Sequence, residues 1–278
     1  MDTPPSAEAI TRASKSNFAL AFIALPPERR RDLTTFYAFC RVVDDIADEP
    51  GRSTEEKASL LAAWKRAVCE AFAGEPPLAP QIRELIGRYR LNPQWLLELI
   101  QGCEMDLVPA RYETFEDLRL YCYRVASVVG LVSIEIFGYQ NEATQHYAVE
   151  LGQALQLTNI LRDVGKDLAN DGRVYLPLAD LARFGIDPSD LATRKGGPRF
   201  GELMAFEARR AEGLYQSAIA QLPPEDRRSM RPAEIMRCIY HRILQKMSRD
   251  RFQVFEKQYR LGKFEKLAIA SRVLLLGR

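Results

Sequence analysis

Apolar residues recur along the chain mainly at intervals of three and four, the spacing of one buried face of an α-helix. Proline, glycine and capping residues divide this pattern into segments. Helices are predicted to begin near Ser14, Pro27, Ser53, Ile82, Asn92, Thr114, Asn141, Phe200 and Pro232, with a short last helix over residues 267–276. We find no convincing apolar–polar alternation, internal repeat or low-complexity linker. We therefore expect one all-α domain of packed antiparallel helices over residues 1–278.

Local chemistry sets several of the predicted boundaries. Ser53 with Glu56 and Thr114 with Asp117 have the spacing of capping boxes, which start helices. The helix from Thr114 is expected to run on through residue 131, and the helix from Asn141 to end near residue 167. Residues 168–177 and 185–198 are expected to be mostly loop, whereas residues 232–259 are predicted to form one long helix.

Composition excludes several classes of function. The chain is 47% hydrophobic and 27% charged, so it can form a substantial core. Its net charge of +2 is too small for a dedicated nucleic-acid binder, and the basic run at residues 28–31 lies at a helix start with acids nearby. Five scattered cysteines without a C-x-x-C pair, and two histidines, do not form the usual zinc site. We expect reduced core thiols in a cytoplasmic protein.

The ends of the chain bear on membrane attachment. The first residues lack a positive segment followed by an apolar run, so no signal peptide is expected. No stretch reaches the roughly 18 apolar residues of a membrane span. The last residues, 263–278, are predicted to pack as a terminal helix, with peripheral contact at the inner face of a membrane as the alternative.

Acidic residues are the clearest candidates for chemistry. Asn159, Asp163 and Asp167 are spaced four apart, about 40° from one another around a helix, so they form one stripe of oxygen ligands. Upstream, Asp44 and Asp48 share one face of the helix that begins near Pro27. Two such helices facing each other would form the hard-oxygen pocket that Mg²⁺ bound to a diphosphate requires.

The alternative interpretation of each acidic pair is a solvated helix face with salt bridges. Both pairs, however, lie within strongly apolar sequence, where an unpaired carboxylate is costly. The same spacing occurs on two separate helices, and each pair is preceded by an arginine, Arg41 or Arg162. These features favour a site for a metal ion and a diphosphate.

Four segments together resemble the squalene/phytoene synthases, which are head-to-head prenyl transferases: residues 41–48, 121–126, 156–167 and 172–177. The resemblance extends from about Ser14 to the last helices. It implies a single isoprenoid-synthase-type helical bundle with a central cavity. Ser127 departs from the glycine that many members have, and Lys257 stands where an arginine is expected.

The resemblance also implies roles for individual residues. The Mg²⁺ ligands would be Asp44, Asp48, Asn159, Asp163 and Asp167. Catalytic or orienting residues would be Tyr37, Arg41, Tyr121, Arg162, Arg173 and Tyr175. Diphosphate contacts would be Ser14, Lys15, Ser16 and Gln156, and the prenyl cavity would be lined by Phe18, Phe22, Val125, Val129, Leu157 and Tyr240. For the apolar members of this last set, ordinary core packing is an equally good interpretation.

Physical chemistry agrees with these roles. Ionising an allylic diphosphate requires Mg²⁺ and fixed donors that neutralise the leaving group. The carbocation that remains requires a dry, apolar cavity with aromatic faces, because water would quench it. We also hypothesise that the loop after Asp167 carries Arg173 over the diphosphate as a lid.

Residues 25–31, 121–126 and 134–139 are most similar to the bacterial presqualene diphosphate synthases of hopanoid pathways. This implies two farnesyl diphosphates as substrates and no use of NADPH. The alternatives are a phytoene synthase, which joins two geranylgeranyl diphosphates, and an NADPH-dependent squalene synthase. A non-catalytic helical assembly factor is a further alternative, against which the complete set of acids and arginines argues.

Overall fold

The computed structural model describes residues 7–9, 18–109, 111–192 and 197–276, and it contains helices and no strand within those ranges. This confirms the all-α prediction. In chain order the elements are α2 (Phe18–Ala21), η1 (Phe22–Ala24), α3 (Pro27–Asp48), α4 (Thr54–Cys69), α5 (Ala79–Tyr89), α6 (Pro93–Met105), α7 (Phe115–Cys122), η2 (Tyr123–Ser127), α8 (Val128–Phe137), α9 (Ala143–Asp171), α10 (Leu178–Arg183), α11 (Pro188–Ala192), α12 (Pro198–Gln221), η3 (Pro224–Asp226), α13 (Arg231–Arg249) and α14 (Lys263–Leu276).

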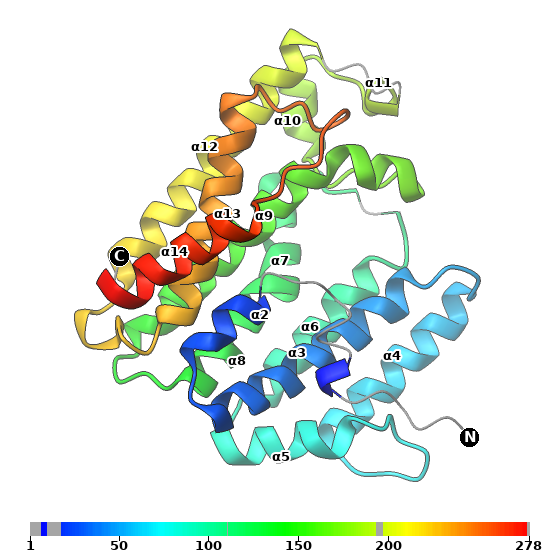
Figure 1. Ribbon diagram of the computed structural model, residues 1–278. Helices are drawn as coiled ribbons and strands as arrows, with labels where there is room; N and C mark the ends of the chain where they lie inside the picture. Colours follow the sequence, from blue (N-terminus) through cyan, green and yellow to red (C-terminus); the bar gives the residue numbers. More distant parts are fainter. Residues whose placement is uncertain (1–6, 10–17, 110, 193–196, 277–278) are drawn as a thin grey trace.

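Helix α9 is the centre of the arrangement. It is 29 residues long and packs against α12, α8, α13 and η2. Helices α2 to α5 occupy the lower half of Figure 1, and α12 and α13 pack on α9 on the other side, with α14 packed on α13. The carboxyl ends of α3 and α9 point toward the same side of the molecule (Figure 1). The two predicted acidic helices therefore present their last turns together.

Helix starts follow the capping chemistry of the sequence. The Ser53 hydroxyl accepts from the Glu56 amide at 3.2 Å, and the Glu56 carboxylate accepts from the Ser53 amide at 2.9 Å. Thr114 and Asp117 form the second capping box. A side-chain cap of this kind contributes about 1 kcal/mol to helix stability. Both predicted capping boxes are confirmed.

The start of α9 is fixed by a buried acid that lies 82 residues after Thr144 in the chain. Asp226 is fully buried, and its carboxylate accepts from the backbone amides of Gln140 and Asn141 at 2.8 and 3.1 Å. It also accepts from the Thr144 hydroxyl at 2.6 Å. These donors satisfy a buried charge that would otherwise be costly, and they anchor the amino end of the central helix.

The long helix predicted over residues 232–259 is wrong in its last part, because α13 ends at Arg249. Arg251 and Phe252 have φ angles of 50° and 54°, the left-handed conformation in which a helix does not continue. The chain then crosses α9: the carbonyl oxygen of Val254 lies 2.5 Å from where a Cβ on Gly165 would be. This non-local contact, rather than local propensity, ends the helix, and α14 begins at residue 263 instead of 267.

A π-helical turn interrupts the helix that runs from Thr114 toward residue 137. Residues Tyr123–Ser127 form this turn, η2, between α7 and α8. There α9 approaches closely: a Cβ on Gly152 would lie 2.6 Å from the Ser127 Cα. The buried Ser127 hydroxyl donates to the Val149 carbonyl at 2.8 Å. The serine at this position therefore adds a bond to α9 that glycine cannot make.

The same run requires a correction to the expectation that no stretch is long and apolar enough to cross a membrane. Residues Phe115–Phe137 meet that test by length and composition. Half of the apolar window is buried inside the fold, where the run packs against α6 and α9. Its apolar character therefore matches that of a core helix.

A buried acidic residue joins α12 to α10. Glu207 is fully buried, and its Oε1 accepts from Arg210 Nη1 at 2.8 Å, while Arg210 also pairs with Asp180. Burial raises the pKa of Glu207 to about 7, with Arg210 opposing the rise and Asp180 adding to it. Its Oε2 has no hydrogen-bond partner among the described residues. With the pKa raised by burial, a protonated Glu207 can donate from this oxygen toward Asp180.

Candidate active site

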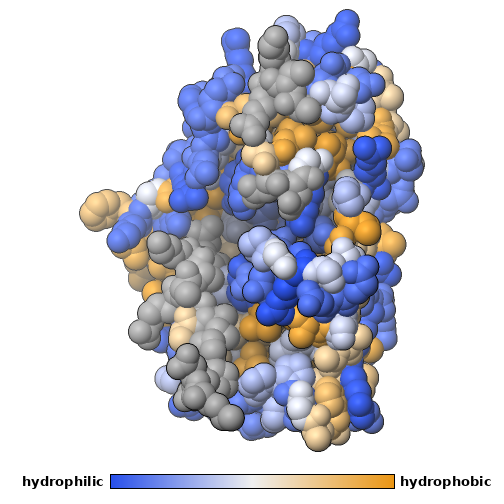
Figure 2. All heavy atoms as spheres, turned by 90° about the vertical axis from the view of Figure 1, so that its right-hand side faces the viewer, coloured by the Kyte–Doolittle hydropathy of each residue, from blue (hydrophilic) through white to orange (hydrophobic). Residues whose placement is uncertain are grey.

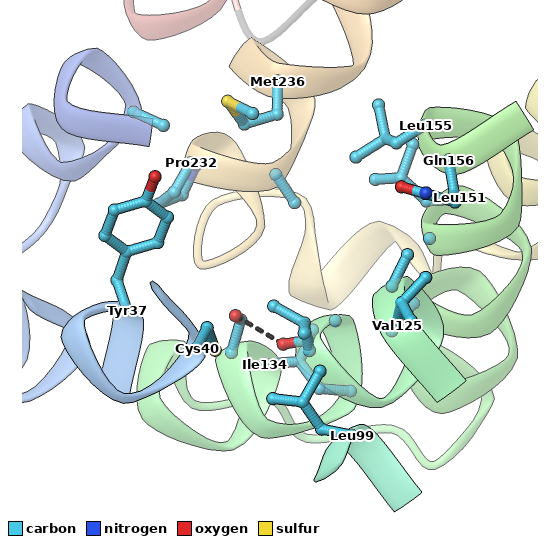
Figure 3. Close-up of a pocket in the computed structure, with 18 of the residues that line it drawn as sticks. Tyr37, Cys40, Leu99, Val125, Ile134, Leu151, Leu155, Gln156, Pro232 and Met236 are labelled. Atoms are coloured by element: carbon cyan, nitrogen blue, oxygen red, sulfur yellow. Dashed lines mark hydrogen bonds between the residues drawn. The ribbon is translucent and has the colours of Figure 1, made fainter. Parts of the chain in front are cut away.

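The main cavity lies among α2 and η1, α3, α6, the α7–α8 run, α9 and α13, and it has a volume of about 340 Å³. Most of the lining is aliphatic or aromatic. Of the described residues that line it, only Arg41 and Asp44 carry a charge. Figure 3 shows Tyr37 and Cys40 from α3 on one side and Leu151, Leu155 and Gln156 from α9 on the other. The enclosed space is therefore apolar, with polar groups confined to one region.

Most of the lining residues predicted from the sequence face this cavity. Phe22, Val125, Val129, Gln156 and Tyr240 all line it, as do Tyr37 and Tyr121. The side chain of Phe18, in α2, is not described, and Ser14, Lys15 and Ser16 lie outside the described residues.

Leu157 requires a correction. It is buried in the core but is not among the described lining residues, and Leu155 faces the cavity instead. The lining positions of α9 are residues 147, 148, 151, 152, 155, 156 and 159, which follow the helical repeat. A residue at position 157 lies about 100° further around the helix than Gln156, toward the opposite packing surface.

The first acidic motif ends α3 at the polar end of the cavity. Arg41 Nη1 lies 2.7 Å from Asp44 Oδ2, and Nη2 pairs with Asp45. The Asp44 side chain remains 47% exposed within the concave mouth, although protein surrounds its carboxylate. Burial raises the pKa of Asp44 to about 6; Arg41 opposes the rise, and Asp48 and Asp45 add to it. Mutual repulsion among these acids is typical of a site that binds a cation.

The second acidic motif lies on α9. Arg162 donates to both oxygens of Asp163, at 2.9 and 2.6 Å. Burial raises the pKa of Asp167 to about 7, and the Asp163 charge adds to the rise, while Lys166 and Arg173 oppose it. Asp163 is therefore held by a guanidinium, whereas the charged form of Asp167 is disfavoured chiefly by burial.

Asn159 carries an unsatisfied atom. Its Nδ2 donates to Gln156 Oε1 at 3.3 Å, but its Oδ1 is buried without a hydrogen-bond partner among the described residues. A buried carbonyl oxygen without a donor is costly, so such an atom calls for an explanation. The amide oxygen belongs to the same helical stripe as Asp163 and Asp167 and is a suitable ligand for a hard cation.

Arg173 links the two motifs. Its guanidinium lies 2.9 Å from Asp48 and donates to the backbone carbonyl of Asp106 at 3.4 Å. Gly172, at φ 65°, caps α9, and the Arg173 amide reaches back to the Asp167 carbonyl at 3.3 Å. The turn that ends α9 thus carries the arginine across to α3. This is the position the lid hypothesis requires, although the diphosphate contact itself stays a prediction.

Asp106, the residue that follows α6, was not found by the sequence analysis. It accepts hydrogen bonds from Tyr175 and Tyr121 at 2.8 and 2.9 Å. Burial raises its pKa above the usual range, and the two tyrosines and Arg173 oppose the rise. The rings of Tyr112, Tyr121 and Tyr175 have centroids 5.3–6.2 Å apart. Tyr175 therefore reaches the site through Asp106, and it lines a small adjoining cavity with Asp167 and Arg173.

Two further tyrosines connect the cavity wall to the motifs. Tyr37 packs edge-on against Phe22, with centroids 6.2 Å apart. Tyr240 lies beside Arg162: burial would lower the pKa of this arginine, but Asp163 and Tyr240 together hold it above its usual value. The cavity wall therefore carries aromatic rings, and the guanidinium of Arg162 places a fixed positive charge at its edge.

The surface around the mouth can be followed in Figure 2, which faces the side where α3 and α9 end. Hydrophilic side chains form a band across the middle of this face, with apolar side chains visible above and below it. An apolar cavity between helices thus has a charged rim built by α3, α9 and the residue after α6. This arrangement suits a molecule with a long apolar chain and a highly charged head.

Comparisons with known proteins agree with that geometry. The family model described as "Squalene/phytoene synthase" matches residues 11–265. A presqualene diphosphate synthase from Zymomonas mobilis is 35% identical, over 98% of this chain and 92% of the relative. A phytoene synthase from Arthrospira platensis is also 35% identical, over 97% of this chain and 91% of the relative.

Two solved structures share the fold. A dehydrosqualene synthase in complex with ligand gives a TM-score of 0.83 at 26% identity, covering 96% of this chain and 93% of the other. A squalene synthase from Alicyclobacillus acidocaldarius gives 0.79 at 30% identity, covering 88% and 93%. The protein is thus an all-α prenyl transferase that acts on prenyl diphosphates. It belongs to the squalene/phytoene synthase family.

Proposed function

We propose that this enzyme joins two farnesyl diphosphates head to head to form presqualene diphosphate, with release of diphosphate. The observation that carries the proposal is the cavity. Its wall is apolar and aromatic, and of the described lining residues only Arg41 and Asp44, at its acidic rim, are charged. A prenyl chain fits such a wall, and its diphosphate would lie where the charges are.

The rim residues fit Mg²⁺. Asp44, Asp48, Asn159, Asp163 and Asp167 would hold it through hard oxygen atoms, and the buried Asn159 Oδ1 would gain the partner it otherwise lacks. No three His, Cys, Asp or Glu side chains in the described part of the chain form a metal site by themselves. Diphosphate oxygens would complete the ligand set. When bound, Mg²⁺ neutralises the developing charge on the leaving group.

The protein's own residues orient the diphosphate and keep water away from the carbocation. Arg162 holds Asp163 through two hydrogen bonds, and Arg173 bridges Asp48 and Asp106. Each guanidinium can shift toward a diphosphate oxygen and bind it with two parallel donors. The ring faces of the cavity tyrosines stabilise a carbocation and expose no strong nucleophile. Asp106 accepts from the Tyr121 and Tyr175 hydroxyls and so fixes the positions of both hydroxyl ends.

The choice of farnesyl diphosphate is supported by the segments at residues 25–31, 121–126 and 134–139, and by the Zymomonas relative, which aligns over nearly all of both chains. The second candidate is phytoene synthesis from two geranylgeranyl diphosphates, because phytoene synthases reach the same identity over a similar length. We propose that NADPH is not used and that the enzyme works in the cytoplasm, within hopanoid synthesis.

The deciding experiment is product analysis. Purified protein is incubated with Mg²⁺ and either farnesyl or geranylgeranyl diphosphate, each with and without NADPH, and the products are identified by mass spectrometry. Presqualene diphosphate from farnesyl diphosphate, unchanged by NADPH, is the expected result. Phytoene from the longer substrate would transfer the assignment to the second candidate, and squalene formed only with NADPH would mean a complete squalene synthase.

A matched variant separates catalysis from folding. Asp163→Asn keeps the shape of the side chain but removes the charge that Arg162 holds. We expect this variant to fold and to lose Mg²⁺-dependent turnover. Absence of diphosphate release by the parent protein under all four conditions would favour a non-catalytic role.

A further inference from the structure

A second, wider groove lies away from the active site, between the end of α12, η3, α13 and α14, with a volume of about 1200 Å³. Six arginines line it: Arg227, Arg228, Arg231, Arg237, Arg242 and Arg272. Only two acids line it with them. Glu234 is paired with Arg237 at 2.8 Å, and Glu265 is paired with Arg242 at 3.2 Å and with Lys246 at 3.0 Å.

The remaining four guanidiniums are not neutralised. Arg227, Arg228, Arg231 and Arg272 form no ion pair with any carboxylate in the described part of the chain. Arg227, Arg228 and Arg272 are exposed, and Arg231 is half-buried. The groove therefore carries an excess of positive charge on a chain whose net charge is only +2. The surface that complements it is anionic.

Helix α14, which forms one side of this groove, has an exposed apolar stripe. Phe264 is 89% exposed, Leu267 50% and Leu275 81%, and the small residues Ala268 and Ser271 lie on the same helical face. The opposite face is also apolar, with Ala270 and Val273 buried, and the helix packs on α13 and α2. A surface helix normally places polar residues on its outer face, so this stripe indicates a partner.

We propose that the α14 stripe and the arginine groove together dock the enzyme on an anionic phospholipid bilayer. The stripe would enter the interface between headgroups and acyl chains, and the free guanidiniums would bind lipid phosphates. The arginine groove by itself would also suit a nucleic acid, but a nucleic acid would leave the apolar side chains of Phe264 and Leu275 in water. A second copy docked by twofold symmetry would bring the unpaired arginines of both copies together.

The placement of α14 suits this role. In Figure 1 it runs across the front of the molecule toward the left edge, whereas α3 and α9 end at the right, so the acidic mouth and α14 do not share a face. The two elements on which it packs also line the apolar cavity, through Pro232 and Met236 of α13 and through Ala21 of α2. One layer of helices therefore separates the bilayer surface from the cavity.

The test measures binding rather than turnover, so its outcome is independent of the proposed reaction. Full-length protein is sedimented with vesicles of phosphatidylcholine alone or with 30 mol% phosphatidylglycerol. Binding to the anionic vesicles, weakened by salt, is expected. Arg228→Gln with Arg272→Gln should lower the partition coefficient on them roughly 25-fold, about fivefold for each charge. Phe264→Ser with Leu275→Ser should lower it by at least about tenfold.

Matched control variants remove arginine charges and an exposed apolar side chain at positions outside the groove and the α14 stripe. Arg90→Gln with Arg249→Gln removes two exposed charges outside the groove, and Leu120→Ser removes an exposed leucine of α7. These variants should bind vesicles like the parent protein. The proposal is overturned if the parent binds neither vesicle, or if the controls lose as much as the test variants.

Two other outcomes would identify a different occupant. A dimer in light scattering that dissociates on Phe264→Ser with Leu275→Ser, without vesicle binding, would mean that the face joins two copies. Retention of duplex DNA, lost in the arginine variant alone and without vesicle binding, would mean a nucleic-acid surface. Either result overturns the membrane proposal.

Discussion

Replacing Glu207 by glutamine should stabilise the protein at pH 8 and leave its stability at pH 5 almost unchanged. Glu207 is fully buried, accepts from Arg210, and has its pKa raised to about 7 from a reference of 4.5. The folded state therefore holds a proton that the unfolded chain releases near its ordinary pKa. Between these two pKa values the folded state binds more protons, so stability falls as pH rises.

The magnitude follows from the width of that window. A difference of about 2.5 pKa units corresponds to about 3 kcal/mol of stability lost between pH 4.5 and pH 7, as an order-of-magnitude figure. Glutamine retains an oxygen that can accept from Arg210 and has an amide that can donate toward Asp180, but it has no proton to release. The variant should therefore exceed the parent by up to about 3 kcal/mol at pH 8.

Urea unfolding followed by circular dichroism, at pH 5, 6, 7 and 8, measures both proteins. Glu202→Gln, an exposed position on the same helix, is the matched control and should show no pH-dependent difference. An advantage of Glu207→Gln that is equal at pH 5 and pH 8 would refute the reasoning, since a simple packing effect does not depend on pH. A loss of stability at every pH would show that the glutamine amide cannot replace the carboxyl proton.

Three further substitutions have defined outcomes. Arg173→Lys keeps the charge beside Asp48 but loses the planar fork, so kcat/KM should fall about 10–100-fold at unchanged melting temperature, and unchanged kinetics would exclude a role at the diphosphate. Asp106→Asn weakens one of the two tyrosine hydrogen bonds and should lower kcat/KM about tenfold in steady-state assays; a drop below twofold would contradict this. Gly165→Ala forces a Cβ to 2.5 Å from the Val254 oxygen and should destabilise by about 1–3 kcal/mol in urea, whereas Gly87→Ala, with open space around it, should not destabilise at all.

Helix starts and the acidic stripe were predictable because their chemistry is local. A serine and a glutamate three residues apart cap a helix whatever surrounds them, as Ser53 and Glu56 do. Residues spaced four apart on α9 must share a face. The end of α13 was not predictable in this way, because it depends on a loop that reaches Gly165 from almost 90 residues away.

Asp106 escaped sequence analysis for a similar reason. It is a single acid after an apolar helix, with no second acid at helical spacing, and its partners Tyr121 and Tyr175 come from two distant segments. The only local signal was a charged residue shortly after the apolar positions Leu99, Ile100 and Cys103. Leu157 was misplaced by one helical face because an apolar residue next to the acidic stripe can point either to the cavity or to α12.

The π-helical turn at η2 decides which residues can share the cavity wall. Tyr121 and Phe137 both line the cavity, yet they are 16 positions apart in the chain. In an unbroken α-helix, at about 100° per residue, they would point about 160° apart, to nearly opposite sides. A π turn takes up one extra residue, which reduces that angle to about 60°. Straightening this segment into a regular α-helix at its present length would turn either the tyrosine or the phenylalanine out of the wall, so the π-helical geometry of Tyr123–Ser127 is as much a part of the site as any side chain.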